Sequence, residues 1–399
     1  MKITTAYSFR LYPSKQQEQK LIATLNLCRF TYNTLLDTFN KHPSITKNEL
    51  QHSLLALKIT HPELNNVYSK VLQYENSKLF FNLKSLSQRK KQGKKVGRLR
   101  FKGKGFFKTF TYNQSGFKII QRDTRYDLLH LSKIGNIPMI MHRDIEGTIK
   151  QITIKHHLSG KWHASIIAET KCKVPQHTSK KQIGIDMGLL NFTVDSNGHK
   201  IAPPKHLHRS LKKLKHQQQR LSRKKKGSKN RNRQRIKVAR IHEKIVNQRD
   251  DFLHKLSHYY TTNYSLIAVE NLVVSSMIQH PCLSRSIADA SWSKFIQMLC
   301  CKAARAGGIV VKVEPRGTSQ TCSNCGKRAK KSLQERIHHC NCGLIMDRDY
   351  NSAIIILQRA LGQELPEVTP VEIEPLPIRT KVPIPSEKEG LVLASERQV

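Results

Sequence analysis

Acidic residues are scarce in this sequence. Its 399 residues include 28 Asp and Glu against 70 Lys and Arg, which gives a formal net charge of +42. A compact fold that carries so much repulsion is expected to meet a polyanion, because Lys and Arg that neutralise phosphates release condensed counterions. A merely basic, solvated surface is the weaker explanation, since the charge is clustered along the chain. The composition therefore predicts a nucleic-acid partner.

Long apolar runs are also missing. No stretch is apolar enough to span a bilayer, and the N-terminus MKITTAYSFRLYP has no apolar segment of signal-peptide type. No basic amphipathic helix with a bulky aromatic face is evident, so a membrane is not the expected polyanion. We expect a cytoplasmic, nucleoid-associated protein of prokaryotic type that has no membrane partner.

Cysteine is too unevenly placed for a disulfide framework. The chain has nine cysteines, and four of them cluster near the C-terminus. These four form two pairs separated by fourteen residues, Cys322 with Cys325 and Cys340 with Cys342. Tetrahedral Zn²⁺ takes four thiolates, which paired knuckles at the two ends of a loop supply. The segment predicts one structural zinc ion. His338 or His339 is an alternative ligand, because the second pair lacks the usual two-residue gap.

The N-terminal half predicts a small β-domain that carries a helical insertion. Residues 1–12 alternate as a strand, and two helical regions follow, the first with Ser14 as its expected cap and the second over about 48–91. A basic, glycine-rich run, SQRKKQGKKVGRLRFKGKG, then leads into short strands and turns, with a hairpin turn expected at 158–160. We predict a wedge-like β-domain over 1–12 and 100–178 and a helical recognition domain over 13–99.

The C-terminal half predicts a mixed sheet with helices on both faces. Three strands are expected over 182–202, followed by a two-helix hairpin over 205–262 with leucines at heptad spacing and a basic turn. The remaining order, strand, helix, strand and helix, completes a pattern that is typical of an RNase H-like nuclease fold. Residues 362–399 are rich in Pro and Glu, and we expect a disordered tail there.

Three acidic residues fall where such a fold needs them. Asp186 ends the apolar strand IGID, Glu270 ends LIAVE, and Asp349 opens the last helix. Strands that are distant in sequence but adjacent in a sheet bring their acidic ends close together. Carboxylates held this close repel and raise one another's pKa unless a cation satisfies them. The pattern predicts two Mg²⁺ ions about 4 Å apart, which activate a water and stabilise the leaving 3′ oxygen in phosphodiester hydrolysis.

Each acid alone has a structural alternative. Asp186 stands two residues before Gly188 and could belong to a turn, and Glu270 could be a paired charge at a strand end. Asp349 could be the N-cap of the last helix. Asp347 could be either that cap or the metal ligand. The joint pattern favours a metal site, since all three acids follow the right elements in the right order.

Several motifs carry a family resemblance. They are GIDMGLLNF, AVENL, SWSKF, VEPRGTSQTCSNCG and CNCGLIMDRDYNSA, in this order and spacing. They resemble the RuvC-type nuclease domain of the TnpB family, whose members are transposon-encoded RNA-guided DNA endonucleases similar to compact type V CRISPR effectors. Upstream, IEGTIKQITIKHHLSGKWHASI is similar to the family's wedge-like β-domain, and FRLYPSKQQEQ is similar to its opening. The resemblance covers nearly everything except the tail.

The resemblance implies roles for these residues. It implies catalysis by Asp186, Glu270 and the latter aspartate of the DRD element, which is Asp349 here. It implies a RuvC-like nuclease domain over 180–361, with a zinc-binding insertion over 317–345. Two positions depart from the family pattern, since Ser352 and Ile355 stand where an alanine and an asparagine are common. Neither position is a proposed metal ligand, so the departures concern the packing of the last helix.

The resemblance also implies partners. It implies a guide RNA from the transposon end, held by the β-domain and the basic hairpin, and target DNA that is cut next to a short flanking motif. The single site would cut both strands in turn, and the transposase of the same element is a further candidate partner. Two alternatives stay open. One is a catalytically idle RNA-guided repressor, and the other is a transposase or resolvase that recognises DNA directly.

Three basic segments supply the expected nucleic-acid contacts. Before the β-domain these are Lys90, Lys91, Lys94, Lys95, Arg98, Arg100, Lys102 and Lys104. On the hairpin they are Arg220, Arg223, Lys224, Lys225, Lys226, Lys229, Arg231, Arg233 and Arg235. The zinc loop adds Lys327, Arg328, Lys330 and Lys331, beside the expected cleavage site. Four aromatic residues could stack on bases, although half of them are expected in the core: Phe101, Phe106, Phe107 and Tyr112.

Overall fold

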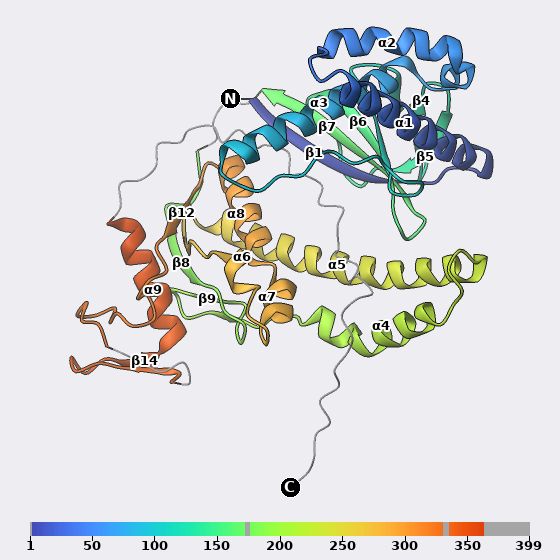
Figure 1. The fold of residues 1–399 in the computed structure, drawn as a ribbon. Coiled ribbons are helices and arrows are strands. Elements are labelled where there is room, and N and C mark those ends of the chain that lie inside the picture. Colours follow the sequence, from blue (N-terminus) through green and yellow to red (C-terminus); the bar gives the residue numbers. More distant parts are fainter. Residues whose placement is uncertain (1, 172–175, 330–334, 363–399) are drawn as a thin grey trace. The chain divides into compact units, whose positions relative to one another are not determined.

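The computed structural model describes residues 2–171, 176–329 and 335–362 (Figure 1). The tail predicted from residue 362 therefore lies outside the described residues from 363 onward, as do Lys330 and Lys331 of the predicted nucleic-acid contacts. Within the described part, no helix combines the length and apolar character that a bilayer crossing needs.

The N-terminal sheet is built around the first strand. Seven antiparallel strands follow the order β2-β6-β7-β1-β5-β4-β3. The central strand β1 (Lys2–Leu11) pairs along its whole length with β7 (Trp162–Lys171) and at its end with β5 (Gly135–Ile140). The others are β2 (Thr109–Asn113), β3 (Phe117–Ile120), β4 (Asp127–Leu131) and β6 (Thr148–His156). The hairpin turn predicted at 158–160 connects β6 to β7, which confirms that prediction.

Three α-helices are inserted between β1 and β2. They are α1 (Lys15–Lys41), α2 (Lys47–Thr60) and α3 (Ser69–Lys91), with a short 3₁₀-helix, Pro62–Asn66, before α3. Ser14 caps α1 as predicted, because its hydroxyl accepts from the Gln17 amide while the Gln17 side chain accepts from the Ser14 amide. The helices share one apolar core with the sheet, in which Leu21 of α1 and Phe110 of β2 are fully buried. The β-domain with a helical insertion is thereby confirmed.

The C-terminal sheet is mixed, as predicted. Its order is β10-β9-β8-β11-β12, with β8 (Gln182–Asp186), β11 (Leu266–Glu270) and β12 (Ile309–Val313) parallel to one another. β9 (Thr193–Asp195) and β10 (Lys200–Ile201) are antiparallel additions at one edge. The helices α5 (Lys229–Asn263) and α8 (Trp292–Ala306) share a core with one face, and α9 (Arg348–Leu361) packs on the other. This is the arrangement of an RNase H-like fold.

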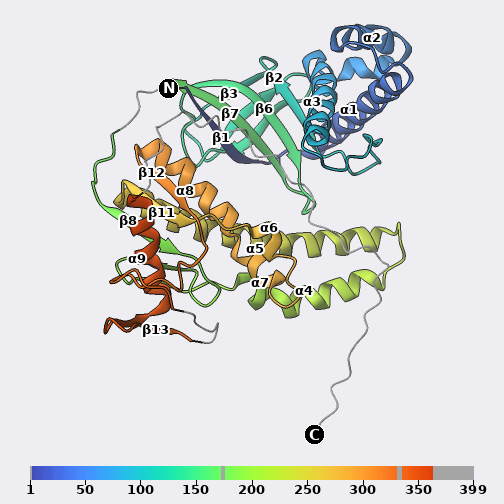
Figure 2. The ribbon, with the colours of Figure 1, turned by 60° about the vertical axis from the view of Figure 1, so that its left-hand side comes forward.

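A helical hairpin separates the first three strands of this sheet from the last two. It consists of α4 (His206–Ser222) and α5, and the basic turn predicted between them covers 223–228 (Figure 2). The shorter helices α6 (Val274–Met277) and α7 (Ser284–Ala290) follow β11. The small hairpin of β13 (Ile337–His339) and β14 (Ile345–Asp347) leads directly into α9.

The backbone of α9 lies directly against the sheet at Gly184 of β8. A Cβ atom added there would collide with the carbonyl oxygen of Ala353 and lie 2.8 Å from the amide nitrogen of Leu357, both in α9. Only glycine lets the helix backbone rest directly on the strand. The position of α9, and of every side chain on its first turn, therefore depends on Gly184.

We predict that Gly184→Ala lowers the free energy of unfolding by about 1–3 kcal/mol, the usual cost of overpacking a well-filled interior. Chemical denaturation of the full chain measures this. Gly97→Ala is the matched control, because Gly97 has open space around its Cβ position and no left-handed backbone angle. Equal stabilities of the two variants would show that α9 can move aside without cost.

Candidate active site and metal centre

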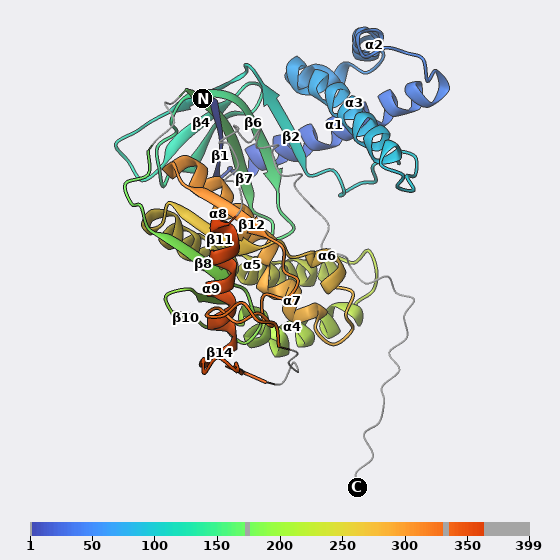
Figure 3. The same cartoon turned by 90° about the vertical axis from the view of Figure 1, so that its left-hand side faces the viewer.

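The three predicted acids are brought to one edge of the C-terminal sheet. β8 and β11 are parallel neighbours whose register pairs Ile185 with Val269, so that Asp186 and Glu270 come next on the two strands. Both acids lie on the α9 side of the sheet, because residues two positions earlier, Gly184 and Ala268, pack against α9. Asp349 sits in the first turn of α9, which lies across β8 and β11 (Figure 3). Three segments that are distant in sequence thus meet.

The acids affect one another's ionisation. Burial raises the pKa of Asp186 well above its ordinary value, and the neighbouring charges of Glu270 and Asp349 raise it further, while Arg348 opposes them. Burial also raises the pKa of Glu270, which is 8% exposed. The Thr318 hydroxyl lies 2.6 Å from Glu270 Oε1, donates to it and lowers that pKa. Such a cluster is stable in its charged form only beside a cation.

The three acids are of the chemical type that binds Mg²⁺, whereas the four-cysteine cluster is the one group of three or more potential ligands that the described residues already hold close enough together for one ion. Mg²⁺ prefers carboxylate oxygens and keeps positions for phosphate oxygens and water. Glu270 is buried, whereas Asp186 and Asp349 are only partly buried at the same edge and so remain accessible to a substrate. Asp186, Glu270 and Asp349 are therefore the residues that would hold the metal.

Asp347 has a different role from Asp349. Its carboxylate accepts hydrogen bonds from the amides of Asp349 and Tyr350, at 3.0 and 3.1 Å, and is the N-cap of α9. Lys200 of β10 also donates to it, at 2.6 Å. The alternative that Asp349 caps the helix is therefore wrong, and Asp347 is already fully engaged. Sequence reasoning missed Lys200, because 147 residues separate it from its partner.

The four predicted cysteine thiols gather into one cluster. Their sulfur atoms all lie within 4.8 Å of one another. Cys322 and Cys342 are 3.7 Å apart, and Cys325 and Cys340 are 3.4 Å apart. Zn–S bonds of about 2.3 Å in a tetrahedron require sulfur atoms about 3.8 Å apart, whereas a disulfide requires about 2.05 Å. The spacing fits one tetrahedral zinc ion, so this insertion has the form of a zinc ribbon.

The second pair of knuckles needs no histidine. Neither His338 nor His339 belongs to the cluster, although both lie on β13, close by in sequence. The Leu344 amide, and after it the Asn324 side chain, lower the pKa of the Cys342 thiol to about 6. Cys342 is thus ready to bind metal as a thiolate. The four cysteines can therefore supply all four ligands by themselves.

Asn351 connects the cysteine cluster to the acids. Its buried side chain donates to the Thr321 carbonyl at 2.7 Å and accepts from the Ser323 amide at 2.9 Å. These two backbone groups flank Cys322, and Asn351 lies two residues after Asp349 on α9. Gln358 of α9 donates to the Ser323 carbonyl as well. The metal loop and the helix of the third acid are therefore held together at a single place.

The basic residues lie in three different settings. Lys90 and Lys91 end α3, and the cations from Lys94 to Lys104 lie on the connection to β2. The hairpin cations lie on or beside the exposed turn, but Arg231 donates to the Leu221 and Lys224 carbonyls and so holds the hairpin closed. In the zinc loop Lys327 is exposed, while Arg328 donates to the Gln320 side chain at 2.9 Å. Individual nucleic-acid contacts stay predictions.

The aromatic residues near the glycine-rich run divide into two pairs. Phe107 and Tyr112 are 9% and 1% exposed and belong to the core. Phe101 and Phe106 are 56% and 80% exposed. The second pair can meet a base, while the first cannot without unfolding the domain.

We predict that Asp347→Ala destabilises the protein by about 1 kcal/mol, the usual cost of a lost N-cap. Asp347→Asn keeps an oxygen that accepts from the helix amides and should lose less. Partial burial disfavours the Asp347 carboxylate, but Lys200 and the helix amides outweigh it and lower its pKa. Its contribution is therefore present at neutral pH and is lost as the pH falls through that lowered pKa. Urea denaturation of both variants across pH measures this, and equal losses for Ala and Asn would contradict the capping role.

Comparison with protein families finds three matches along the chain. The model OrfB_IS605, described as "Probable transposase", matches residues 165–280. A model described as "Cas12f1-like, TNB domain" matches 292–356, which includes the cysteine cluster. A model described as "Helix-turn-helix domain" matches 1–41, where the structure has β1 and α1.

Related proteins and a solved structure agree with these matches. InsQ of Escherichia coli (strain K12), provisionally named as an RNA-guided DNA endonuclease, is 30% identical over 94% of this chain and 98% of its own. A Streptomyces pristinaespiralis protein with the same kind of provisional name is 29% identical over 90% of each chain, and the TnpB-like protein L79 of Acanthamoeba polyphaga mimivirus is 26% identical over 53% of this chain. A Cas12f1 solved with its sgRNA and target DNA shares the fold, with a TM-score of 0.58 over 89% of this chain at 13% identity. This chain belongs to the TnpB family.

Proposed function

We propose that this protein is an RNA-guided, Mg²⁺-dependent endonuclease that cuts double-stranded DNA for a transposable element. One observation carries the proposal: Asp186, Glu270 and Asp349 converge from two strands and a helix at one sheet edge, where their repulsion calls for a metal. The names of the relatives and the charge of +42 support nucleic acid as the substrate. A metal with a purely structural role would not require the three acids to lie at an edge of the sheet that a substrate can reach.

The residues of the proposed site have different roles in catalysis. Asp186, Glu270 and Asp349 would hold two Mg²⁺ ions, which when bound activate a water and stabilise the leaving 3′ oxygen of a phosphodiester. Thr318 orients the Glu270 carboxylate, and Asp347 fixes the first turn of α9 so that Asp349 faces the strands. Because only one such cluster exists among the described residues, the two DNA strands would be cut in turn.

The nucleic-acid partners are assigned by charge. A guide RNA from the transposon end would bind the β-domain and the basic hairpin, and the target DNA would be recognised by base pairing beside a short flanking motif. The transposase of the same element is a further proposed partner. Phe101 and Phe106, exposed within the basic run before β2, are proposed to stack on bases.

A binding protein without nuclease activity is the second candidate. The geometry disfavours it, since a site that no longer cleaves has no physical reason to retain three mutually repelling carboxylates. A directly DNA-recognising transposase or resolvase is a third. Purified protein that is stripped of RNA by RNase and still cuts a specific sequence would favour that third candidate.

The central test uses the protein purified with its co-expressed RNA and a plasmid library with randomised sequence beside the target. We expect cutting that requires both Mg²⁺ and the matched RNA, and we expect Asp186→Asn to reduce it by about 10³-fold or more, as when a catalytic metal ligand is lost. DNA binding should persist in this variant. Guide-dependent binding without any cutting by the wild type would instead identify a repressor.

The same variant controls for folding. The pKa of Asp186 is raised in the fold, so its charge costs stability at neutral pH when no divalent metal is present. Asp186→Asn removes that charge and should be at least as stable as the wild type in metal-free buffer. Added Mg²⁺ should raise the melting temperature of the wild type more than that of the variant.

The zinc loop yields a separate prediction. We expect Cys322→Ser to lose bound zinc and cleavage together, although all three acids remain. Asn351→Ala should retain zinc but lose cleavage, because it removes the contact between the loop and α9. Zinc is measured by metal analysis of the purified protein. Cys282→Ser is the control, since Cys282 is exposed and lies outside the cluster. A Cys322→Ser variant that lacks zinc and cuts normally would make the loop dispensable.

A further inference from the structure

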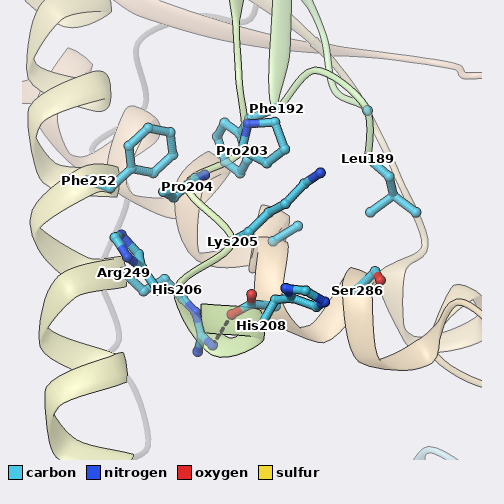
Figure 4. A pocket seen from close by; sticks show the side chains of 13 residues that line it. Leu189, Phe192, Pro203, Pro204, Lys205, His206, His208, Arg249, Phe252 and Ser286 are labelled. Carbon is cyan, nitrogen blue, oxygen red and sulfur yellow. Dashed lines mark hydrogen bonds and ion pairs between the residues drawn. The ribbon is translucent and has the colours of Figure 1, made fainter. Parts of the chain in front are cut away.

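A pocket opens on the α5 side of the sheet, the face opposite the one on which the acids lie. Its volume is about 330 Å³, within the range of small-ligand sites. Its walls come from the turn after β8, the segment before α4, the helix α5 and the short helix α7 (Figure 4). Three of its residues, Gly188, Leu189 and Phe192, lie in the motif GIDMGLLNF, but the sequence did not indicate a pocket there.

The position of the pocket connects it to the reaction. Gly188 lines it and stands two residues after Asp186, at the carboxyl end of β8. Ser286 and Asp289 line it from α7, which follows the end of β11 and therefore follows Glu270. In α/β sheets, ligands bind in the crevice outside the carboxyl ends of the strands. A DNA strand that crosses the carboxyl edge of the sheet from the acids toward α5 would therefore meet this pocket.

The lining has two kinds of surface. One wall is apolar and partly aromatic, formed by Leu189, Phe192 and Phe252 with two prolines beside them. Phe192 and Phe252 contact each other edge to face with ring centroids 5.0 Å apart, so this wall is rigid. Lys205 and Arg249 supply positive charge on the other side. A ligand with a flat apolar ring and an anionic or polar edge would complement both surfaces.

Arg249 lacks one of its partners. Its Nη2 atom is paired with the Asp289 carboxylate, as Figure 4 shows. Its Nε atom is buried and has no hydrogen-bond acceptor among the described residues. A buried donor without an acceptor costs free energy, and a ligand oxygen or ring nitrogen can supply the missing acceptor once the Arg249 side chain turns to expose Nε to the pocket.

Lys205 is held in an unusual conformation. It precedes α4 with φ at 48°, in the left-handed region that side chains other than those of Gly and Asn seldom adopt. Its side chain extends toward Leu189 at the edge of the pocket (Figure 4). Strain of this kind persists where the surroundings enforce it and is common at ligand sites.

We propose that this pocket binds one nucleotide of the DNA strand that is being cut. The base would lie against the apolar wall, its polar edge or its phosphate would meet Arg249 Nε, and Lys205 would neutralise the backbone. The inference rests on the proposed function, because it supplies the substrate of the same site. By fixing one nucleotide, the pocket would set which phosphodiester lies at the acids.

The test places the fluorescent base 2-aminopurine at successive positions around the cut site of a guided target. Ca²⁺ replaces Mg²⁺, so that the bound DNA remains uncut. We expect the fluorescence of a single position to change on binding to the wild type. Ala290→Trp, which fills the pocket from α7, should abolish that change and slow Mg²⁺-dependent cutting by about tenfold or more, the loss expected when one stacked base is given up.

Two variants complete the design. Ala288→Trp is the matched control, because Ala288 is exposed on the same helix and does not line the pocket. It should keep both the fluorescence change and the cutting rate. Should Ala290→Trp fail to fold, Lys205→Asn removes the cation with a residue that tolerates the left-handed backbone, and it should weaken the same signal.

The outcomes separate this inference from the proposed function. A wild type that cuts guided DNA, with no 2-aminopurine position that responds to Ala290→Trp or Lys205→Asn, would overturn the pocket and leave the nuclease intact. The same holds if Ala290→Trp and Ala288→Trp cut equally well. A wild type that neither binds nor cuts guided DNA would overturn both.

Discussion

The direct packing of the α9 backbone on Gly184 of β8 is the contact on which the site depends. It brings Asp349 to the edge where Asp186 and Glu270 end their strands. Neighbouring charge and burial together raise the pKa of Asp186, so the approach of Asp349 works against electrostatic repulsion. The apolar contacts of α9 with β11 and β12 must offset that repulsion until a cation arrives. The sheet is thus stable enough to hold a site that is unfavourable without metal.

The zinc loop provides a second contact that fixes the position of α9. Its sequence between the cysteine pairs is polar and rich in lysine, and it has too little apolar content to fold by itself. A metal ion bound by the cysteines would replace the missing core and make the chain on either side of Cys322 rigid. Asn351 links α9 to this part of the chain, because its side chain forms hydrogen bonds with the backbone on both sides of that cysteine. This explains why a structural metal lies so close in sequence to the DRD element.

The sequence predicted well whatever depends on local pattern. The strands that end in Asp186 and Glu270, the Ser14 cap and the heptad hairpin all follow from spacing of apolar residues and turn chemistry, and all were found. Contacts between distant segments could not be predicted in this way. Lys200 meets Asp347 only because β10 lies at the start of α9, and Arg231 closes the hairpin instead of facing outward. The pocket likewise forms from four segments that share no motif.

The burial of single aromatic residues also depends on tertiary contacts that the sequence pattern does not predict. Phe106 and Phe107 are adjacent in sequence, yet the first is 80% exposed and the second 9%. Strand alternation does not help, because Phe110, Thr111 and Tyr112 of β2 are all buried, although consecutive side chains of a strand point to opposite faces. Whether an aromatic residue meets a base or the core is decided by a neighbouring layer that only the tertiary fold reveals.

Charge explains why the site needs residues beyond its acids. In the proposed function, three carboxylates would repel the phosphate that they cut, and the overall charge of +42 does not remove that local repulsion. At about 0.1 M salt, interactions between exposed charges are screened beyond about 10 Å, so distant lysines can steer DNA but cannot hold it at the acids. Arg348 is a cation near enough to Asp186 to act there, and in the further inference Lys205 in the pocket would act on the neighbouring part of the strand. Metal bound at the acids and cations in the pocket would then have the same effect, because each would offset part of the electrostatic repulsion between the DNA strand and the carboxylates.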